Sequence, residues 1–368
     1  MKNTALIFLT ALLFACSSTQ HAVSQKVFTP ADGNIMGRAI KNADSTVTLS
    51  ASAASCSVSF TGLDCVVYLK NATPYQGDYN YVNFELDGMY VGRQKVDVQV
   101  AVPYIIKAVG NDMQHKLVIS KATEAANGQI IITKIDAQNL TAPKEDFKTK
   151  IEFIGNSITC GFGNDMEIPC GNGSKWYDQH NAYFSYASLT ARAVNAAYMI
   201  SAISGAGIYR NWNSDGPTVP QQYQNAFLNT DSTNKWNFSS YIPDIVTIAL
   251  GTNDMSNGDG KTARLSFDKA KYIATYKKFI KTIYSHYPDA QLVLLNSPMV
   301  GGQNNLLLQE CITSVQNEIN SEVKPGKPIK IFWFNAMQPA GCGYHPSISD
   351  HQIMANQLIP FIKQLLKQ

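Results

Sequence analysis

Charged residues are scarce in this 368-residue chain, and no part of it carries a dense run of lysines and arginines. They make up 15% of the sequence, and the formal net charge is only +3. A groove that follows a phosphate backbone needs clustered basic side chains, so nucleic acid is a poor partner. The sequence also lacks a P-loop and a Gly-x-Gly-x-x-Gly motif after a strand. Nucleotide chemistry therefore has no recognisable site.

The N-terminal segment 1–25 contains an apolar run that is too short to span a bilayer as a helix. Its end, Leu13-Phe14-Ala15-Cys16-Ser17, resembles a bacterial lipoprotein signal, which is cleaved before a cysteine that receives lipid. We therefore predict lipidation at Cys16, and Ser17 in the next position indicates an outer-membrane lipoprotein that faces the periplasm or the cell surface. The alternative is a plain secretory signal, and both interpretations place the mature chain outside the cytoplasm.

The cysteines show no metal-binding pattern. None of them lies in a Cys-x-x-Cys pair, and no histidine cluster accompanies them. We expect neither a metal ion nor an organic cofactor. Beyond Cys16 an even number of cysteines remains, which favours disulfides in an oxidising compartment. The sequence does not fix the pairing, although proximity along the chain favours Cys56–Cys65 and Cys160–Cys170, leaving Cys311–Cys342.

Residues 26–140 have the pattern of β structure. Short apolar runs recur, several of them alternating with polar residues, and turn residues such as Thr61-Gly62 and Asp87-Gly88 separate them. Many short strands at regular spacing are typical of a β-sandwich or jelly roll. We predict a first domain with strands at 47–50, 56–60, 65–69, 81–86, 96–100, 115–119 and 129–133, and with no helix between them.

The pattern changes at residues 141–150, which are charged, contain Pro143 and form a predicted linker. In the second domain, 151–368, apolar runs of strand length alternate with helical patterns. This alternation favours an α/β domain whose parallel, flavodoxin-like sheet is covered by helices on both faces. We predict strands at 151–154, 197–203, 244–250, 291–295 and 330–334, and helices at 183–195, 267–286 and 349–367.

Three of these strands are followed by polar loops, and a fourth polar loop precedes the final helix. Because parallel strands point the same way, we expect all four loops to meet at one edge of the sheet, where open α/β sheets bind ligands. Singly, each residue has an ordinary structural interpretation, such as a turn glycine or a helix cap. The loops are Gly155-Asn156-Ser157, Ser204-Gly205-Ala206-Gly207, Gly251-Thr252-Asn253-Asp254 and Gly343-Tyr344-His345-Pro346.

Acyl transfer needs the groups that these loops supply. Ser157 becomes a nucleophile when a base removes its proton, and His345 is the natural base because imidazole titrates near neutral pH. The backbone amides of Ser157 and Gly205 and the side-chain amide of Asn253 can donate to the oxyanion of a tetrahedral intermediate. We therefore predict a serine esterase with Ser157 and His345 as its catalytic residues.

The ordered set of Ser, Gly, Asn and His resembles the SGNH hydrolase superfamily. The absence of Gly-x-Ser-x-Gly argues against the ordinary α/β-hydrolase nucleophile elbow. A β-sandwich ahead of such a domain, with Met36-Gly37-Arg38 near its start, is more closely similar to carbohydrate esterase family two. This resemblance covers nearly all of the mature chain. It implies an acetyl xylan esterase-like O-deacetylase acting on acetylated plant-wall oligo- and polysaccharides, whether xylan, mannan or glucan.

The sequence departs from the SGNH pattern in two respects. Asn156 stands where the usual Gly-Asp-Ser has its aspartate, and Cys342 and Gly343 occupy the positions where the triad acid precedes the histidine. The simplest interpretation is a serine–histidine dyad in which a backbone carbonyl orients the imidazole. Asp350, which follows His345, is the alternative. Because the acid orients and stabilises the imidazole, its loss matters less than loss of the base.

Aromatic residues in the loops of this edge can stack on a sugar ring. We predict this role for Trp212, with packing as the alternative, and Trp176 has the same two interpretations. We interpret His351 as structural and His180 as a loop residue. The rival functions are a lipase or lysophospholipase activity of the SGNH type, and a surface glycan-binding protein with an inert hydrolase domain. We expect a monomer that contacts the membrane only through its lipid anchor.

Overall fold

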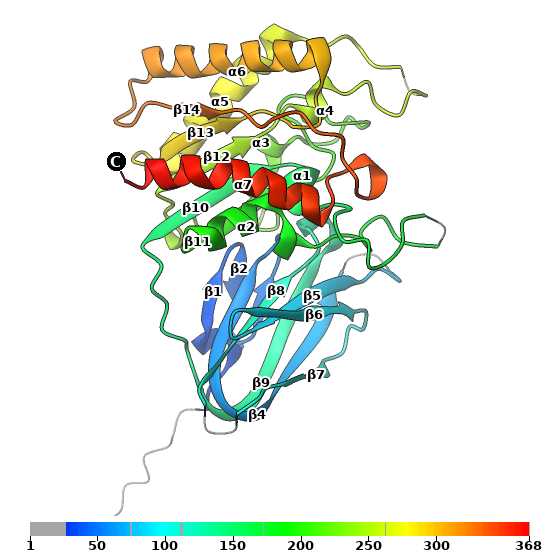
Figure 1. Cartoon of the computed structure of the whole chain (residues 1–368), viewed down its shortest axis with the longest axis vertical. Helices are drawn as coiled ribbons and strands as arrows, with labels where there is room; N and C mark the ends of the chain where they lie inside the picture. Colours follow the sequence, from blue (N-terminus) through cyan, green and yellow to red (C-terminus); the bar gives the residue numbers. More distant parts are fainter. Residues whose placement is uncertain (1–26, 74–75, 111–112, 172, 262, 368) are drawn as a thin grey trace, which may run out of the picture.

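The computed structural model describes residues 27–367 apart from 74–75, 111–112, 172 and 262, so the predicted lipidation site Cys16 lies outside the described residues. Figure 1 shows a β domain in the lower half of the view and an α/β domain above it, joined by an extended segment between β9 and β10. Within the described ranges, no helix has the length and apolarity needed to cross a membrane.

Alternating side chains build the core of the β domain. In β8, Leu117 and Ile119 are fully buried, whereas Lys116 and Val118 are only partly covered, which is the period of two that a strand imposes. The strands pair antiparallel in the order β2-β3-β9-β4-β8-β5-β6, and β1 and β7 also pair with β4. The bounds are β1 Asn34–Met36, β2 Ala39–Lys41, β3 Val47–Leu49, β4 Ser55–Ala72, β5 Asn80–Leu86, β6 Met89–Val96, β7 Val102–Lys107, β8 His115–Lys121 and β9 Gln129–Thr141.

Two details of the predicted β domain are wrong. The strands predicted at 56–60 and 65–69 form the single strand β4, and Thr61-Gly62 is an irregularity in its pairing with β9, not a turn. Gly62 has a φ of 92°, which glycine tolerates, so the strand bends and continues. Residues 97–100, predicted as strand, connect β6 to β7. Most of β6 is exposed, so its sequence carries little hydrophobic pattern.

The α/β domain contains a parallel five-stranded sheet in the order β11-β10-β12-β13-β14. The first strand of the domain therefore lies between the second and the third, which is the flavodoxin-like order. This confirms the fold class predicted from the sequence. The strands are β10 Thr149–Gly155, β11 Ala196–Ala202, β12 Ile245–Ala249, β13 Gln291–Leu295 and β14 Lys330–Phe332.

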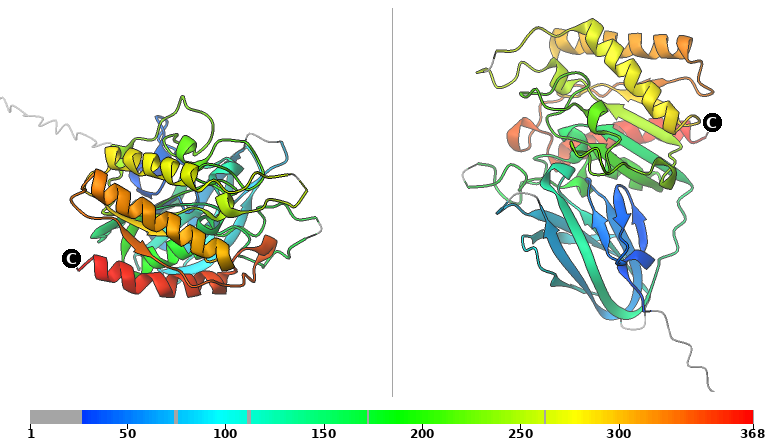
Figure 2. Two further views of the ribbon diagram at one scale, coloured as in Figure 1. Left: turned by 90° about the horizontal axis from the view of Figure 1, so that it is seen from above. Right: turned by 180° about the vertical axis from the view of Figure 1, so that it is seen from behind.

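Helices cover both faces of this sheet (Figures 1 and 2). Helices α2 and α7 pack with Phe153 and Val293 on one face, whereas α5 and α6 pack with Val246 and Leu294 on the other. Helix α6 is absent from the sequence-based prediction, and α7 continues through Pro360. The helices are α1 Ser157–Cys160, α2 Tyr186–Ala193, α3 Val219–Gln222, α4 Thr252–Met255, α5 Lys269–His286, α6 Gly302–Glu322 and α7 Ile348–Leu365.

A buried charged group joins the two domains. Arg38, from the β domain, is fully buried and donates to the Ser201 hydroxyl and to the carbonyls of Tyr223 and Asn225. Its guanidinium lies 3.9 Å from Glu152 on β10, which accepts hydrogen bonds from Ser201 and Tyr223. The β domain thereby contacts the strand that leads into the Gly155-Asn156-Ser157 loop.

Candidate active site

Ser157 lies at the carboxyl end of β10, as the first residue of the short helix α1. The Asn156 side chain caps this helix by accepting the backbone N–H of Ile158 at 3.1 Å. A Cβ atom at Gly155 would meet the Thr159 hydroxyl at 2.1 Å, so only glycine permits the tight passage from strand to helix. Asn156 thus takes a capping role that leaves the serine at the end of the strand.

His345 is in direct contact with the serine. Its Nε2 lies 2.8 Å from Ser157 Oγ, and its Nδ1 lies 2.8 Å from the carbonyl oxygen of Gly343. With Nδ1–H donating to that carbonyl, Nε2 is the free acceptor for the serine proton. The Gly343 carbonyl is therefore the backbone group that orients the His345 imidazole, as the sequence predicts for a serine–histidine dyad. Asp350 instead accepts the backbone N–H groups of Ala340 and Ser347 and caps α7.

The environment keeps the imidazole of His345 neutral. Phe162 packs against it with the ring centroids 4.3 Å apart. Burial lowers the pKa of His345 to about 4, and the hydrogen bond to Gly343 opposes this only in part. At neutral pH the ring is therefore in the unprotonated form that a general base requires.

Two backbone amides in the loops at this sheet edge are available as donors. Neither the N–H of Ser157 nor that of Gly205 has a hydrogen-bond acceptor among the residues that the structure describes. Gly205 has a φ of 72°, which favours glycine. The Asn253 amide donates one hydrogen to the carbonyl of Ala206 at 2.8 Å and retains a second. These groups fit the donor set of an oxyanion hole.

Asp254 fixes the loop that follows Gly205. It is fully buried, and its carboxylate accepts the backbone N–H groups of Ile208, Tyr209 and Arg210. A Cβ atom at Gly207 would lie 2.5 Å from this carboxylate. The Gly251-Thr252-Asn253-Asp254 and Ser204-Gly205-Ala206-Gly207 loops are thereby locked together at one sheet edge.

The disulfide pairing expected from sequence proximity is wrong. The structure contains a Cys170–Cys342 bond with a Cα–Cα distance of 5.5 Å, while Cys56, Cys65, Cys160 and Cys311 are buried thiols. Cys56 and Cys65 both lie in the continuous strand β4, where Cys56 pairs with β8 and Cys65 pairs with β7. The observed bond ties the loop after α1 to the turn that precedes His345.

Of the other residues singled out from the sequence, the two tryptophans lie at the surface and the two histidines are buried. Trp212 is 45% exposed, and its backbone N–H donates to the Gly205 carbonyl at 2.7 Å. Trp176 is 47% exposed and stacks on Phe162. His351 is buried and its Nδ1 accepts the backbone N–H of Tyr186, a structural role. His180 also lies in a loop, but it is fully buried.

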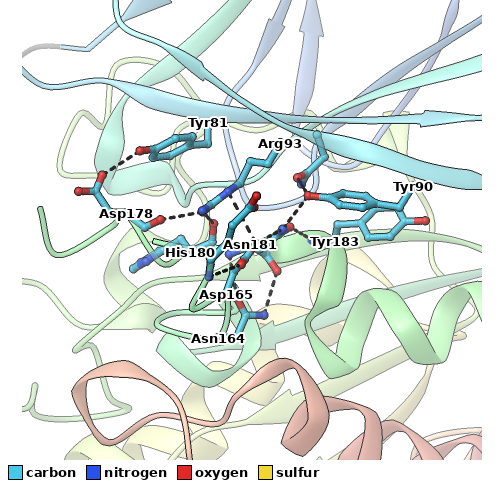
Figure 3. Close-up of polar contacts among 11 residues, drawn as sticks. Tyr81, Tyr90, Arg93, Asn164, Asp165, Asp178, His180, Asn181 and Tyr183 are labelled. Atoms are coloured by element: carbon cyan, nitrogen blue, oxygen red, sulfur yellow. Dashed lines mark hydrogen bonds and ion pairs between the residues drawn. The ribbon is translucent and has the colours of Figure 1, made fainter. Parts of the chain in front are cut away.

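Sequence reasoning missed the contacts that the β domain makes with the active-site loops. Figure 3 shows Arg93, on β6, reaching into the loop between α1 and α2. Arg93 donates to the carbonyls of Asp178 and His180 at 2.8 Å each, and Asn181 donates to Asp165 and to Tyr90. Nothing local marks these residues, because each contact joins positions far apart in the chain. The described ranges contain no group of three or more side chains that could hold a metal ion.

Comparison with known proteins gives a consistent result for both domains. Residues 35–143 match the carbohydrate esterase 2 N-terminal family, and residues 153–325 match the GDSL-like lipase/acylhydrolase family. An acetylxylan esterase/glucomannan deacetylase of Cellvibrio japonicus is 30% identical, with 99% of each chain covered. The cellulase/esterase CelE of Acetivibrio thermocellus is 32% identical over 84% of this chain, which spans only 36% of that protein.

Solved structures agree with this assignment. A family two carbohydrate esterase from Clostridium thermocellum, determined in complex with cellohexaose, is 29% identical and has a TM-score of 0.79. It covers 91% of this chain, and 99% of its own length is matched. A family two enzyme from Cellvibrio japonicus has the same fold, with a TM-score of 0.79 at 24% identity. With both domains and a full-length relative matched, the chain belongs to the family two carbohydrate esterases and is a carboxylic ester hydrolase.

Proposed function

We propose that this esterase removes O-acetyl groups from plant-wall oligo- and polysaccharides through an acetyl-enzyme formed on Ser157. The observation that carries the proposal is the 2.8 Å contact between Ser157 Oγ and His345 Nε2, in a histidine whose other nitrogen is occupied by the Gly343 carbonyl. The similarity to an acetylxylan esterase/glucomannan deacetylase supports acetyl as the group removed.

The steps follow from the positions of these groups. His345 Nε2 takes the proton of Ser157 as Oγ attacks the acetyl carbonyl, and the resulting oxyanion accepts hydrogen bonds from the amides of Ser157 and Gly205 and from Asn253. The C–O bond to the sugar then breaks, and the imidazolium returns the proton to the departing sugar oxygen. Water, deprotonated by His345, attacks the acetyl-enzyme, and collapse of this second intermediate releases acetate and restores the serine.

Exposed aromatic rings supply the surface for the sugar. Trp212 hydrogen-bonds through its backbone to Gly205, so its indole is attached directly to the loop that bears the oxyanion donor. Flat apolar rings of this kind pack on the faces of pyranose units in xylan, mannan or glucan. Trp212→Ala should raise KM for acetylated polysaccharide several-fold and leave KM for 4-nitrophenyl acetate unchanged. Equal effects on both substrates would assign Trp212 to packing.

Acetate release from acetylated xylan, acetylated glucomannan and acetylated cello-oligosaccharides tests the proposal. We expect wild type to release acetate from at least one of them and Ser157→Ala to release none. Equal rates for the two proteins would refute the serine mechanism. A preference for 4-nitrophenyl octanoate over the acetate would favour the lipase alternative, and polysaccharide binding without acetate release would favour the glycan-binding one.

We also propose that the chain is an outer-membrane lipoprotein attached through Cys16. The support is the signal-like segment that ends in Leu13-Phe14-Ala15-Cys16, followed by Ser17. Expression with a labelled fatty acid should label wild type but not Cys16→Ala, and density-gradient fractionation should place wild type in the outer membrane. Wild type without label, recovered in the soluble fraction, would favour the plain secretory signal.

A further inference from the structure

Glu124 is a buried carboxylate of the β domain that lies against the active-site loops of the other domain. It directly precedes the short 3-10 helix Ala125–Asn127, between β8 and β9, and is fully buried. The mechanism described above does not use it. A buried charge is costly unless it is paired and hydrogen-bonded, so the groups that surround Glu124 indicate its role.

One oxygen of Glu124 contacts both halves of the catalytic apparatus. Oε2 accepts the backbone N–H of Ser204 at 2.8 Å, and Ser204 directly precedes Gly205. The same oxygen accepts the thiol of Cys160 at 3.2 Å, and Cys160 ends the four-residue helix that Ser157 begins. The helix that begins at Ser157 and the loop that contains Gly205 therefore both donate a hydrogen bond to one oxygen atom of the other domain.

The second oxygen faces a histidine that the β domain also holds in place. Oε1 of Glu124 lies 3.6 Å from His180 Nε2, and Arg93 donates a hydrogen bond to the His180 carbonyl (Figure 3). His180 packs on Phe162, whose ring also contacts His345. His180 and Phe162 thus form a chain of contacts that connects Glu124 to His345.

The charged and titratable groups around Glu124 are few. The ammonium of Lys121 donates to the Glu124 backbone carbonyl at 2.5 Å, and burial lowers the pKa of Lys121 to about 7. Burial lowers the pKa of His180 and raises that of Cys160. Burial alone would raise the pKa of Glu124, but His180 and Ser204 together hold it below its usual value.

We propose that Glu124 is a positioning residue of the esterase, through which the β domain sets the distance between the Ser157 turn and the Gly205 amide. The inference rests on the proposed roles of Ser157 and Gly205. An oxyanion donor works only within a narrow range of distances, and a misplacement of about 1 Å can cost about 10²-fold in rate. Because the oxyanion forms only after the substrate has bound, the loss should appear in kcat and not in KM.

Three substitutions separate position from charge. Glu124→Gln keeps an oxygen at the Oε2 position and places an amide toward His180, so its kcat should stay within about threefold of wild type. Glu124→Asp keeps the charge but withdraws the oxygen by one methylene, and Glu124→Ala removes it. Both should lower kcat by about 10²-fold with KM changed by less than about threefold. The acid limb of the kcat/KM profile should not move to higher pH in Glu124→Gln, because the negative charge of Glu124 raises the pKa of His345.

Glu85 provides the matched control. It accepts the Tyr183 hydroxyl at 2.8 Å across the same domain interface, and none of its hydrogen bonds within the described residues reaches the catalytic loops. Glu85→Gln and Glu85→Ala should keep wild-type kcat, and thermal unfolding of every variant shows whether it is folded. If Glu124→Ala does not fold, the order of Glu124→Gln and Glu124→Asp decides the question.

The outcomes have distinct meanings. Wild-type kcat in a folded Glu124→Ala or in Glu124→Asp, or a Glu124→Gln as impaired as Glu124→Asp, would overturn the positioning role. Ser157→Ala is measured in parallel on the same substrate. If it is inactive and the Glu124 variants are unaffected, only this inference fails, whereas an active Ser157→Ala overturns the proposed function and this inference together.

Discussion

Removal of the Cys170–Cys342 disulfide should lower the stability of the α/β domain far more than its activity. The bond closes a loop with a sequence separation of 172 residues. Loop-closure entropy for that length gives about 5 kcal/mol as a limit, and native disulfides commonly contribute about 2–5 kcal/mol. We therefore expect Cys170→Ser/Cys342→Ser to lose about 2–5 kcal/mol of unfolding free energy.

The turn that carries His345 keeps other ties without the disulfide. Cys342 N–H donates to the Gly163 carbonyl at 2.8 Å, and Gly341 N–H donates to the His345 carbonyl at 2.8 Å. For this reason kcat on 4-nitrophenyl acetate should fall by less than about tenfold, since the backbone hydrogen bonds are unchanged.

Urea unfolding followed by tryptophan fluorescence measures the stability change. Wild type treated with a reductant should unfold like the double variant, and reductant should leave the double variant itself unchanged. Unfolding midpoints that coincide for oxidised wild type and the double variant would refute the reasoning. A loss of kcat of about 10²-fold or more, in a folded double variant, would show that the disulfide positions the base.

Three further changes test other parts of the structure. Asn253→Ala should lower kcat by about 10²–10³-fold, about 2.7–4 kcal/mol, in a steady-state assay if its free amide hydrogen serves the oxyanion. Protonation of His345 inactivates the base, and burial lowers the pKa of His345 to about 4. We therefore expect kcat/KM to stay constant as the pH falls through 6.5 and to reach half its plateau value only near pH 4. A stopped assay of acetate release can measure this profile. Arg38→Met should cost about 3–5 kcal/mol in urea unfolding because Glu152 stays buried and unpaired, and adding Glu152→Leu should recover much of that loss.

The strand pattern of the α/β domain was predictable because all its strands except the edge strand β14 are largely buried on both faces. The predicted strand 291–295 coincides with β13, and 244–250 contains β12. Helix α6 was not predictable to the same degree. Its buried side chains, such as Leu308 and Ile319, are spread over a mostly polar sequence, so the helical period is weak. In the β domain, the Thr61-Gly62 pair was ambiguous because glycine serves both turns and bulges.

The contact between Ser157 and His345 was predictable from the strand ends, whereas the contacts that hold their loops in place were not. A parallel sheet brings successive loops to one edge, so Ser157 and His345 follow from order along the chain. The disulfide depends instead on where the loop after α1 folds back, and Cys170 and Cys342 are separated by most of the domain. Glu124 lies in the other domain, and no spacing rule connects it to Ser204. Long-range pairs of this kind are fixed by tertiary packing, which a single sequence does not display.

A backbone carbonyl in place of the triad acid changes the pKa of His345 and therefore its strength as a base. A carboxylate would orient the imidazole and also stabilise the imidazolium, raising its pKa. The Gly343 carbonyl supplies the orientation at 2.8 Å but carries no charge, and burial then dominates and lowers the pKa of His345. His345 is therefore fully unprotonated at neutral pH but is a weaker base, so proton transfer from Ser157 is less favourable. The oxyanion donors must accordingly supply a larger share of the transition-state stabilisation, which is where rigid placement of Gly205 has its greatest effect.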